Sequence, residues 1–183
     1  DRLGRYQLIG ERGRGAFGRV YEAFDPALDR RVAIKLVSLP TQPSAVALAE
    51  LLREAKAMAQ IQHPNVLPIY DAGRVDDGVF ITMPIVDGEN LDEWARRQRE
   101  ERGGVDPDQV LGRFGSRIAA GLGAIHAAGF VHRDVKPENL LVSGDEVWVA
   151  DLGLARRAAQ QTSSSGIPAA PDTVSRTTSI GGT

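Results

Sequence analysis

The stretch V-H-R-D-V-K-P-E-N, residues 131–139, decides how this sequence is interpreted. It brings the carboxylate of Asp134, the ammonium of Lys136 and the carboxamide of Asn139 into six successive positions. A carboxylate can orient a hydroxyl group and accept its proton, a cation can neutralise a transferring phosphoryl group, and an amide oxygen can hold a hard divalent cation. Turn chemistry or surface charge explains each residue singly, but it does not explain the ordered set.

A second oxygen ligand follows this stretch. Asp151 lies twelve residues after Asn139, in D-L-G, directly after the short apolar run 147–150. An aspartate at the end of a strand can share a divalent cation with a nearby amide oxygen. The pair Asn139 and Asp151 is therefore the candidate metal site.

A glycine-rich segment, G-R-G-A-F-G, lies near the start of the chain and contains Gly13, Gly15 and Gly18. Glycines let backbone N–H groups approach phosphate oxygens closely. The same glycines would also suit a tight β-hairpin or a dinucleotide-binding fingerprint. The fingerprint requires a helix at the third glycine, whereas residues 20–24 are typical of a strand, which disfavours it.

One lysine, Lys35, ends the apolar run V-A-I-K. A single lysine in a strand ordinarily faces solvent. On the helix that follows, however, Glu54 shares a face with Leu51 and Ala55, and an inward carboxylate is costly without a partner. We therefore predict a Lys35–Glu54 ion pair that aims the ammonium group at phosphates.

The remaining pattern indicates a β-rich front part and a helical rear part, joined near residues 83–88. Ser44 is the expected N-cap of the first helix, and Asp106 that of a long helix ending at Gly129. The expected strands are 6–9, 20–24, 31–37, 66–71, 79–86, 139–142 and 147–150.

Composition excludes several classes of function. The chain has 183 residues, no cysteine and a net charge of -2, so thiolate chemistry is excluded and nothing favours nucleic acid. Arg96, Arg97 and Arg99 are balanced by Glu93, Glu100 and Glu101 nearby in the sequence, which is typical of a solvated helix face. No run of about twenty apolar residues that could cross a membrane is present, and no signal peptide is recognisable.

Taken in order, G-x-G-x-x-G-x-V, V-A-I-K, the helix glutamate, H-R-D-x-K-P-E-N and D-x-G resemble the eukaryotic-type (Hanks-type) serine/threonine protein kinases. D-P-A-L-D-R-R-V-A-I-K resembles the bacterial branch of that family. The resemblance implies an α+β, protein-kinase-like two-lobe fold, with an N-terminal antiparallel sheet plus one helix and a mainly helical C-terminal lobe. Residues 1–86 would form the N-lobe, 87–157 a partial C-lobe with the catalytic loop, and 158–183 a disordered activation segment.

The resemblance also implies roles for single residues. Asp134 would be the catalytic base, Lys136 would lie beside the γ-phosphate, and Lys35 paired with Glu54 would bind the α- and β-phosphates of ATP. Asn139 and Asp151 would ligate Mg²⁺, with Mn²⁺ as a possible substitute. The glycines would cover the phosphates, and the adenine site would be formed by Val20, Ala33, Met83, Pro84, Val86 and Leu141.

Arg133, next to the base, resembles kinases that are switched on by phosphorylation of the activation segment. Ser175 or Thr177 is the predicted switch site, with Thr173, Thr178 and Ser179 as alternatives. The expected partners are ATP and proteins that carry serine or threonine, without nucleic acid or a membrane segment. The expected location is cytoplasmic, and a membrane anchor outside this segment stays open.

Two substitutions and the end of the sequence differ from the family pattern. Leu152 replaces the usual phenylalanine of D-F-G, and Pro84 replaces an acidic residue whose carbonyl, the group needed for adenine, is retained. The sequence ends before an A-P-E motif, which leads us to expect an incomplete rear lobe and exposed apolar surface along helix 106–128. The alternative function is therefore a non-catalytic, pseudokinase-like module that binds ATP or a partner. A small-molecule phosphotransferase of related fold is a third and weaker interpretation.

Overall fold

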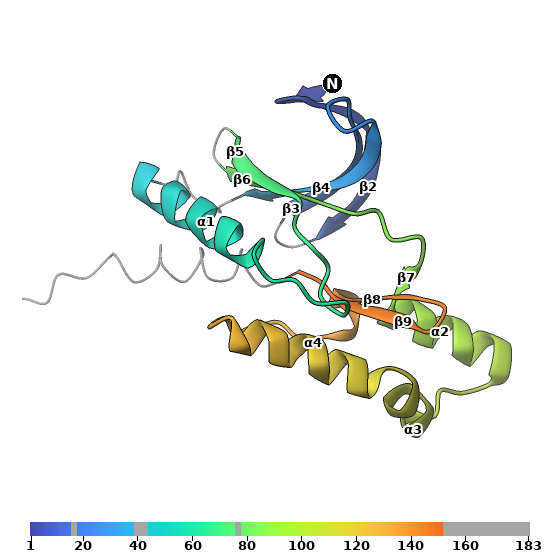
Figure 1. Cartoon of the computed structure of the whole chain (residues 1–183). Helices are drawn as coiled ribbons and strands as arrows, with labels where there is room; N and C mark the ends of the chain where they lie inside the picture. Colours follow the sequence, from blue (N-terminus) through green and yellow to red (C-terminus); the bar gives the residue numbers. More distant parts are fainter. Residues whose placement is uncertain (16–17, 39–43, 76–77, 152–183) are drawn as a thin grey trace, which may run out of the picture.

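A computed structural model describes residues 1–15, 18–38, 44–75 and 78–151 (Figure 1). Its front part is a six-stranded antiparallel sheet with strand order β1-β2-β3-β4-β6-β5. Its rear part carries a small sheet with order β7-β8-β9 beside the remaining helices. The front strands are β1 (Arg2–Leu3), β2 (Tyr6–Gly15), β3 (Gly18–Asp25), β4 (Arg30–Ser38), β5 (Asp71–Val75) and β6 (Gly78–Met83).

Strand β4 has buried apolar side chains on both of its faces. Val32 and Ile34 are fully buried on one face, where they pack with Tyr6. The alternate residues Ala33 and Lys35 point to the opposite face, toward the rear part of the molecule. The lysine thus has a fixed direction that follows from the period of the strand.

Helix α1 (Ala45–Met58) covers part of the front sheet and contacts β5 and β6 (Figure 1). Its N-cap is Ser44, as predicted, whose hydroxyl accepts a hydrogen bond from the Ala47 N–H at 3.1 Å. The buried side chains of α1 recur at helical spacing: Leu48, Leu51, Ala55 and Met58.

The rear part begins at β7 (Glu89–Asn90) and α2 (Leu91–Arg102). A full capping box starts α2, since Asn90 accepts from the Glu93 N–H and Glu93 accepts from the Asn90 N–H. The elements that follow are α3 (Pro107–Val110), the π-helical turn η1 (Leu111–Gly115), α4 (Ser116–Ala127), the 3-10 turn η2 (Pro137–Asn139), β8 (Leu140–Ser143) and β9 (Glu146–Val149).

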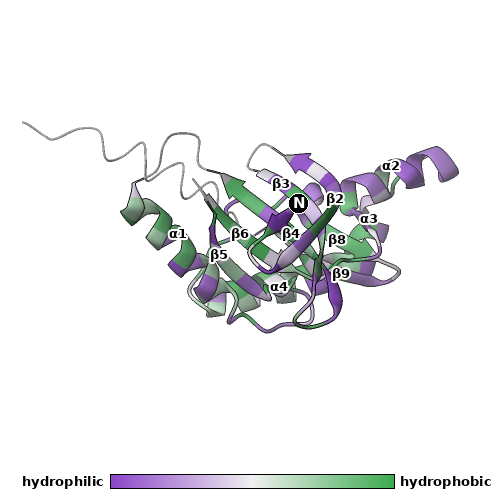
Figure 2. Cartoon of the chain, turned by 90° about the horizontal axis from the view of Figure 1, so that it is seen from above, coloured by the Kyte–Doolittle hydropathy of each residue, from purple (hydrophilic) through white to green (hydrophobic). Residues whose placement is uncertain are grey.

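Most residues of α2 are hydrophilic (Figure 2). Arg96 pairs with Asp92, and Arg97 pairs with Glu89 and Glu101. Arg96 and Arg97 are thus neutralised on an exposed helix face, although of the predicted partners only Glu101 forms one of these ion pairs. The described residues contain no helix long and apolar enough to cross a membrane.

Two expectations about secondary structure were wrong. The strand expected at 66–71 begins only at Asp71, because the preceding segment bonds to β9 instead: the Leu67 N–H donates to the Val149 carbonyl at 2.9 Å. The expected single helix 106–128 is interrupted by η1, which contains Gly112 and Gly115. Such a turn takes an extra residue into the helix and shifts the side chains that follow.

Of the apolar side chains along this helical region, Leu111 is 65% exposed, whereas Phe114 and Ile125 are fully buried, so the structure shows one exposed leucine and not the expected exposed surface. One apolar core joins the front and rear parts. It runs from Leu51 and Met58 on α1 through Val66 to Ile125 on α4 and Val149 on β9. Because this core is continuous, the two sheets are held in a fixed relation and enclose the space between them.

Candidate active site

A cleft of about 350 Å³ lies between the front sheet and the small rear sheet. This volume is in the range of sites for small molecules and cofactors. Nine of the residues predicted from the sequence line it: Val20, Ala33, Lys35, Met83, Pro84, Val86, Asn139, Leu141 and Asp151. The other predicted residues lie outside this lining, namely Gly13, Gly15, Gly18, Glu54, Asp134 and Lys136.

Strand register divides the cleft into two ends. In one row across the sheet, Ala33 pairs with Met83, and this row leads to the segment 84–86. In the next row Val20 pairs with Lys35. Ala33 and Met83 make the first end of the cleft apolar, and Lys35 brings a cation into the second.

Lys35 forms an ion pair with Asp151 at the polar end of the cleft. Its side chain is only 13% exposed, so the ammonium group is held in place by the cleft walls. The backbone of Asp151 has a φ of 61°, a conformation that non-glycine residues adopt rarely and that is found often at functional sites. Glu54 lies half-buried on α1, and its pairing with Lys35 stays a prediction.

His132 connects the two segments that carry Asp134 and Asp151. Its ring is 2% exposed, its Nε2 lies 2.8 Å from the Ala150 carbonyl, and its Nδ1 accepts from the Asp134 N–H at 3.3 Å. These two bonds require the tautomer that carries its proton on Nε2. Because Ala150 precedes Asp151, the imidazole fixes both aspartates with respect to each other. Its place in H-R-D marked His132 in the sequence, but its hydrogen-bonding role could be seen only in the structure.

Asp134 is held by two neighbours from its own loop. The Asn139 amide Nδ2 donates to the Asp134 carbonyl at 2.8 Å and to its carboxylate Oδ2 at 3.2 Å. The Lys136 ammonium lies 3.3 Å from the same carboxylate oxygen. Since the Asp134 side chain is also only 12% exposed, its carboxylate is in a defined position. Arg133, with a φ of 62°, supplies the turn that this arrangement needs.

The donor atoms at the polar end fit a magnesium ion that is also bound by phosphates. Since Nδ2 of the buried Asn139 is engaged with Asp134, its amide oxygen is the atom that remains to bind a cation. Asp151 adds a carboxylate in the same cleft. Within the described ranges no group of three or more His, Cys, Asp or Glu forms a metal site. Magnesium in nucleotide sites needs only one or two protein oxygens, because phosphates and water complete its shell.

The glycine-rich segment forms a hairpin between β2 and β3, in which Gly15 pairs with Gly18. Gly18 has a φ of 144°, and a Cβ atom there would lie 1.8 Å from the Leu36 carbonyl oxygen. Only glycine fits this position. The strand that follows the third glycine also excludes the dinucleotide-binding fingerprint, which needs a helix there.

Several cleft residues were missed in the sequence. Arg12 precedes the first glycine, and Asn90, Glu93 and Glu138 line the opposite side. For two of them the sequence pattern indicates another role, since Asn90 and Glu93 form the capping box at the start of α2. Three predicted features lie outside the described residues: Leu152, the switch sites Ser175 and Thr177, and the proposed activation segment 158–183.

Comparison with known proteins gives a consistent result. Residues 6–179 match the protein kinase domain family. Serine/threonine-protein kinase PknD of Mycobacterium tuberculosis is 39% identical over 159 residues, which are 86% of this chain and 23% of PknD. Serine/threonine-protein kinase PknE of the same organism is 39% identical over 154 residues, covering 84% of this chain and 26% of PknE. The chain thus spans about a quarter of the length of these curated relatives.

Among solved structures, the PknI kinase domain of Mycobacterium tuberculosis superposes with a TM-score of 0.71 at 27% identity. The match covers 85% of this chain and 62% of that domain. The expected kinase-like α+β fold is thereby confirmed. From its cleft, its catalytic segment and these relatives together, the chain belongs to the protein kinase family, as a eukaryotic-type serine/threonine kinase of the bacterial branch.

Proposed function

We propose that this chain transfers the γ-phosphoryl group of ATP to serine and threonine hydroxyls of proteins. The observation that carries the proposal is the connection between Asp134 and the polar end of the cleft, where Asp151 and Lys35 lie. His132 links Asp134 to the segment that contains Asp151, and Asp151 contacts Lys35 in the cleft. A hydroxyl-activating carboxylate thus lies next to a site for a charged, metal-bound ligand.

The apolar end of the cleft is proposed to hold the adenine ring. Val20 and Ala33 of the front sheet and Leu141 of the rear sheet all line the cleft, and apolar side chains of this kind suit an aromatic ring. Met83, which pairs with Ala33 across the sheet, also lines this space. The backbone of Pro84 and Val86 would bind the adenine edge, and the proline offers its carbonyl for this contact.

The polar end is proposed to hold the triphosphate. Lys35 would exchange its contact with Asp151 for the α- and β-phosphates, supported by Glu54, and the hairpin of Gly13, Gly15 and Gly18 would cover them with backbone N–H groups. Asn139 and Asp151 would ligate Mg²⁺, or Mn²⁺ in its place. When bound, the cation offsets negative charge on the β- and γ-phosphate oxygens.

Asp134 is proposed to act on the hydroxyl of the substrate. The hydroxyl oxygen forms a bond to the γ-phosphorus, the bond from that phosphorus to the β,γ-bridging oxygen breaks, and ADP leaves with the electron pair. The hydroxyl proton passes to the Asp134 carboxylate. Lys136, 3.3 Å from that carboxylate, would balance the charge on the phosphoryl group during transfer.

The substrates in this proposal are proteins, and ATP is supplied in the cytoplasm, where we place this domain. Arg133 would pair with a phosphate on Ser175 or Thr177 and so favour the active arrangement of its loop. Phosphorylation at either position stays a prediction.

The experiment is transfer of label from ATP carrying a labelled γ-phosphate to peptide mixtures whose only hydroxyl is serine, threonine or tyrosine. We expect label on serine and threonine peptides with Mg²⁺, and none when EDTA removes the cation. Label on tyrosine peptides alone would contradict the proposal. Binding of ATP without transfer to any peptide would favour the non-catalytic, pseudokinase-like alternative.

A further inference from the structure

We infer that Arg12 covers one face of the nucleotide base, so that the base site has a cation in one of its walls. This inference rests on the proposed function and adds to it the recognition of the base. It starts from the lining of the cleft, in which the guanidinium-bearing Arg12 appears together with Val20, Ala33 and Leu141. Arg12 thus contributes a cation to the part of the lining that also holds these three apolar side chains.

A β-bulge aims Arg12 into the cleft. Strand β2 pairs Glu11 with Tyr21 and Gly13 with Val20, so that Arg12 is an extra residue without a partner of its own in β3. Bulges bend a strand and redirect a side chain. Here the redirected side chain comes to the face of Val20, which lines the cleft.

An ion pair sets which end of the cleft Arg12 covers. Its Nε lies 3.8 Å from Glu22 Oε2, and Glu22 pairs across the sheet with Ala33, whose other neighbour is Met83. This is the row at the apolar end. Lys35 belongs to the next row, beside Val20. The guanidinium is therefore held over the base end and away from the triphosphate end.

Arg12 keeps a surface free for a ligand. Glu22, whose side chain is 13% exposed, is shared between Arg12 and Arg31, so one carboxylate serves two guanidinium groups. The Arg12 side chain is 47% exposed, and its contact with Glu22 is longer than a hydrogen bond. An exposed pair of this kind stabilises a fold little by itself. A planar guanidinium stacks well on an aromatic face, and a purine base offers one.

The test compares three ligands that share the adenine base and differ in phosphate charge. The dissociation constants of adenosine, ADP and ATP are measured for wild type, Arg12→Gln, Arg12→Lys and Arg19→Gln. Arg19 is the matched control, since it is a half-exposed arginine on β3 that pairs with Glu11 and does not line the cleft. Thermal unfolding of each variant is recorded beside the binding.

If Arg12 stacks on the base, Arg12→Gln raises the dissociation constants of all three ligands by the same factor, about 3- to 30-fold. Arg12→Lys loses less affinity than Arg12→Gln, and Arg19→Gln binds the three ligands as tightly as wild type. A loss that grows from adenosine to ATP would overturn the inference, because Arg12 would then act on phosphates. Unchanged binding in Arg12→Gln would also overturn it while leaving the proposed function intact. Failure of wild type to bind ATP would overturn both.

A double-mutant cycle with Glu22→Gln tests how Arg12 is held in place. If Glu22 positions Arg12, Glu22→Gln lowers the affinity for adenosine in the wild-type background and has no further effect on it in the Arg12→Gln background. Equal losses from Glu22→Gln in both backgrounds would contradict this positioning role.

Discussion

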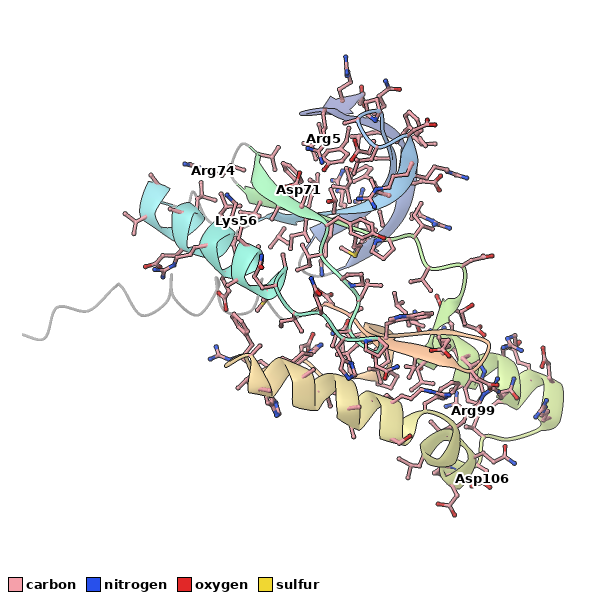
Figure 3. All side chains as sticks on the ribbon, in the orientation of Figure 1. Arg5, Lys56, Asp71, Arg74, Arg99 and Asp106 are labelled. Atoms are coloured by element: carbon pink, nitrogen blue, oxygen red, sulfur yellow. The ribbon has the colours of Figure 1, made fainter. Side chains whose placement is uncertain are left out.

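Tyr6, one of the largest fully buried side chains in the described part of the molecule, ties together strands from opposite ends of the front sheet. Its hydroxyl donates to Asp71 Oδ2 at 2.9 Å and accepts from Arg5 Nη2 at 2.7 Å. Arg5 and Asp71 also form an ion pair and face each other in Figure 3. Because β2 and β5 are not neighbours in the sheet, this contact requires the sheet to curl. The polar cluster stabilises that curl, which in turn shapes the roof of the cleft.

Burial raises the pKa of Tyr6 above its ordinary value, against the lowering effects of the Thr82 hydroxyl and the Arg5 charge. A raised folded-state pKa means that the neutral phenol is favoured by folding. This contribution is fully present below about pH 10, the unfolded value, and is lost as the pH rises through the folded pKa. We therefore predict that the unfolding free energy of wild type falls more steeply above pH 10 than that of Tyr6→Phe. Urea titrations over this pH range measure the two slopes, with Tyr70→Phe as a control that keeps Tyr6. Equal slopes in wild type and Tyr6→Phe would refute the prediction.

At the scale of the element, α4 and the segment before β5 determine where β9 lies. The Asn65 carbonyl accepts from the Val149 N–H at 2.8 Å, and the Asn65 side chain donates to the Val147 carbonyl at 3.0 Å. Helix α4 packs onto this junction through Gly121, where a Cβ atom would lie 2.5 Å from the Asn65 oxygen. The helix therefore fixes the strand that leads to Asp151.

Two glycines of α4 allow this packing to be tested within one helix. A Cβ atom at Gly121 meets backbone, whereas one at Gly123 meets nothing within 4 Å. We predict that Gly123→Ala raises the unfolding free energy by up to about 1 kcal/mol, because alanine favours the helix. Gly121→Ala should lower it by about 1–3 kcal/mol through overpacking. Denaturant unfolding measures both, and the same sign of change in both variants would show that α4 does not pack as described.

At the scale of the whole molecule, the sequence predicted what depends on short motifs. The front sheet with one helix, and the selection of Asp134 and Asp151 as candidate site residues, follow from patterns of a few residues. Features that depend on distant contacts were missed. Residues 66–70 have strand-like composition, but Val66 and Leu67 pair with Val149 of β9, about eighty residues away in the chain, and only Tyr70 bonds to β6. The ion pair of Lys35 with Asp151 likewise joins residues far apart in the sequence.

The position of Arg12, which we infer to lie over the base, was missed for the same reason, because it depends on contacts between strands. An arginine before the first glycine is visible in the sequence, but its direction depends on a bulge that only the register of β2 and β3 reveals. The hydrogen bonds of His132 are a further case, since they require the end of β9 to lie beside the catalytic loop.

The central claim is that Asp134 serves phosphoryl transfer from ATP, and intact mass after incubation with ATP and Mg²⁺ tests it most directly. Wild type should gain phosphoryl groups, and mapping would show whether Ser175 or Thr177 carries them. Asp145→Asn is the matched control, because this exposed aspartate pairs with Arg113 away from the cleft, and it should gain phosphate like wild type. Asp134→Asn should slow the gain by about 10²- to 10⁴-fold. Phosphate gained by Asp134→Asn at the wild-type rate, or no gain by wild type while ATP is bound, would contradict the account.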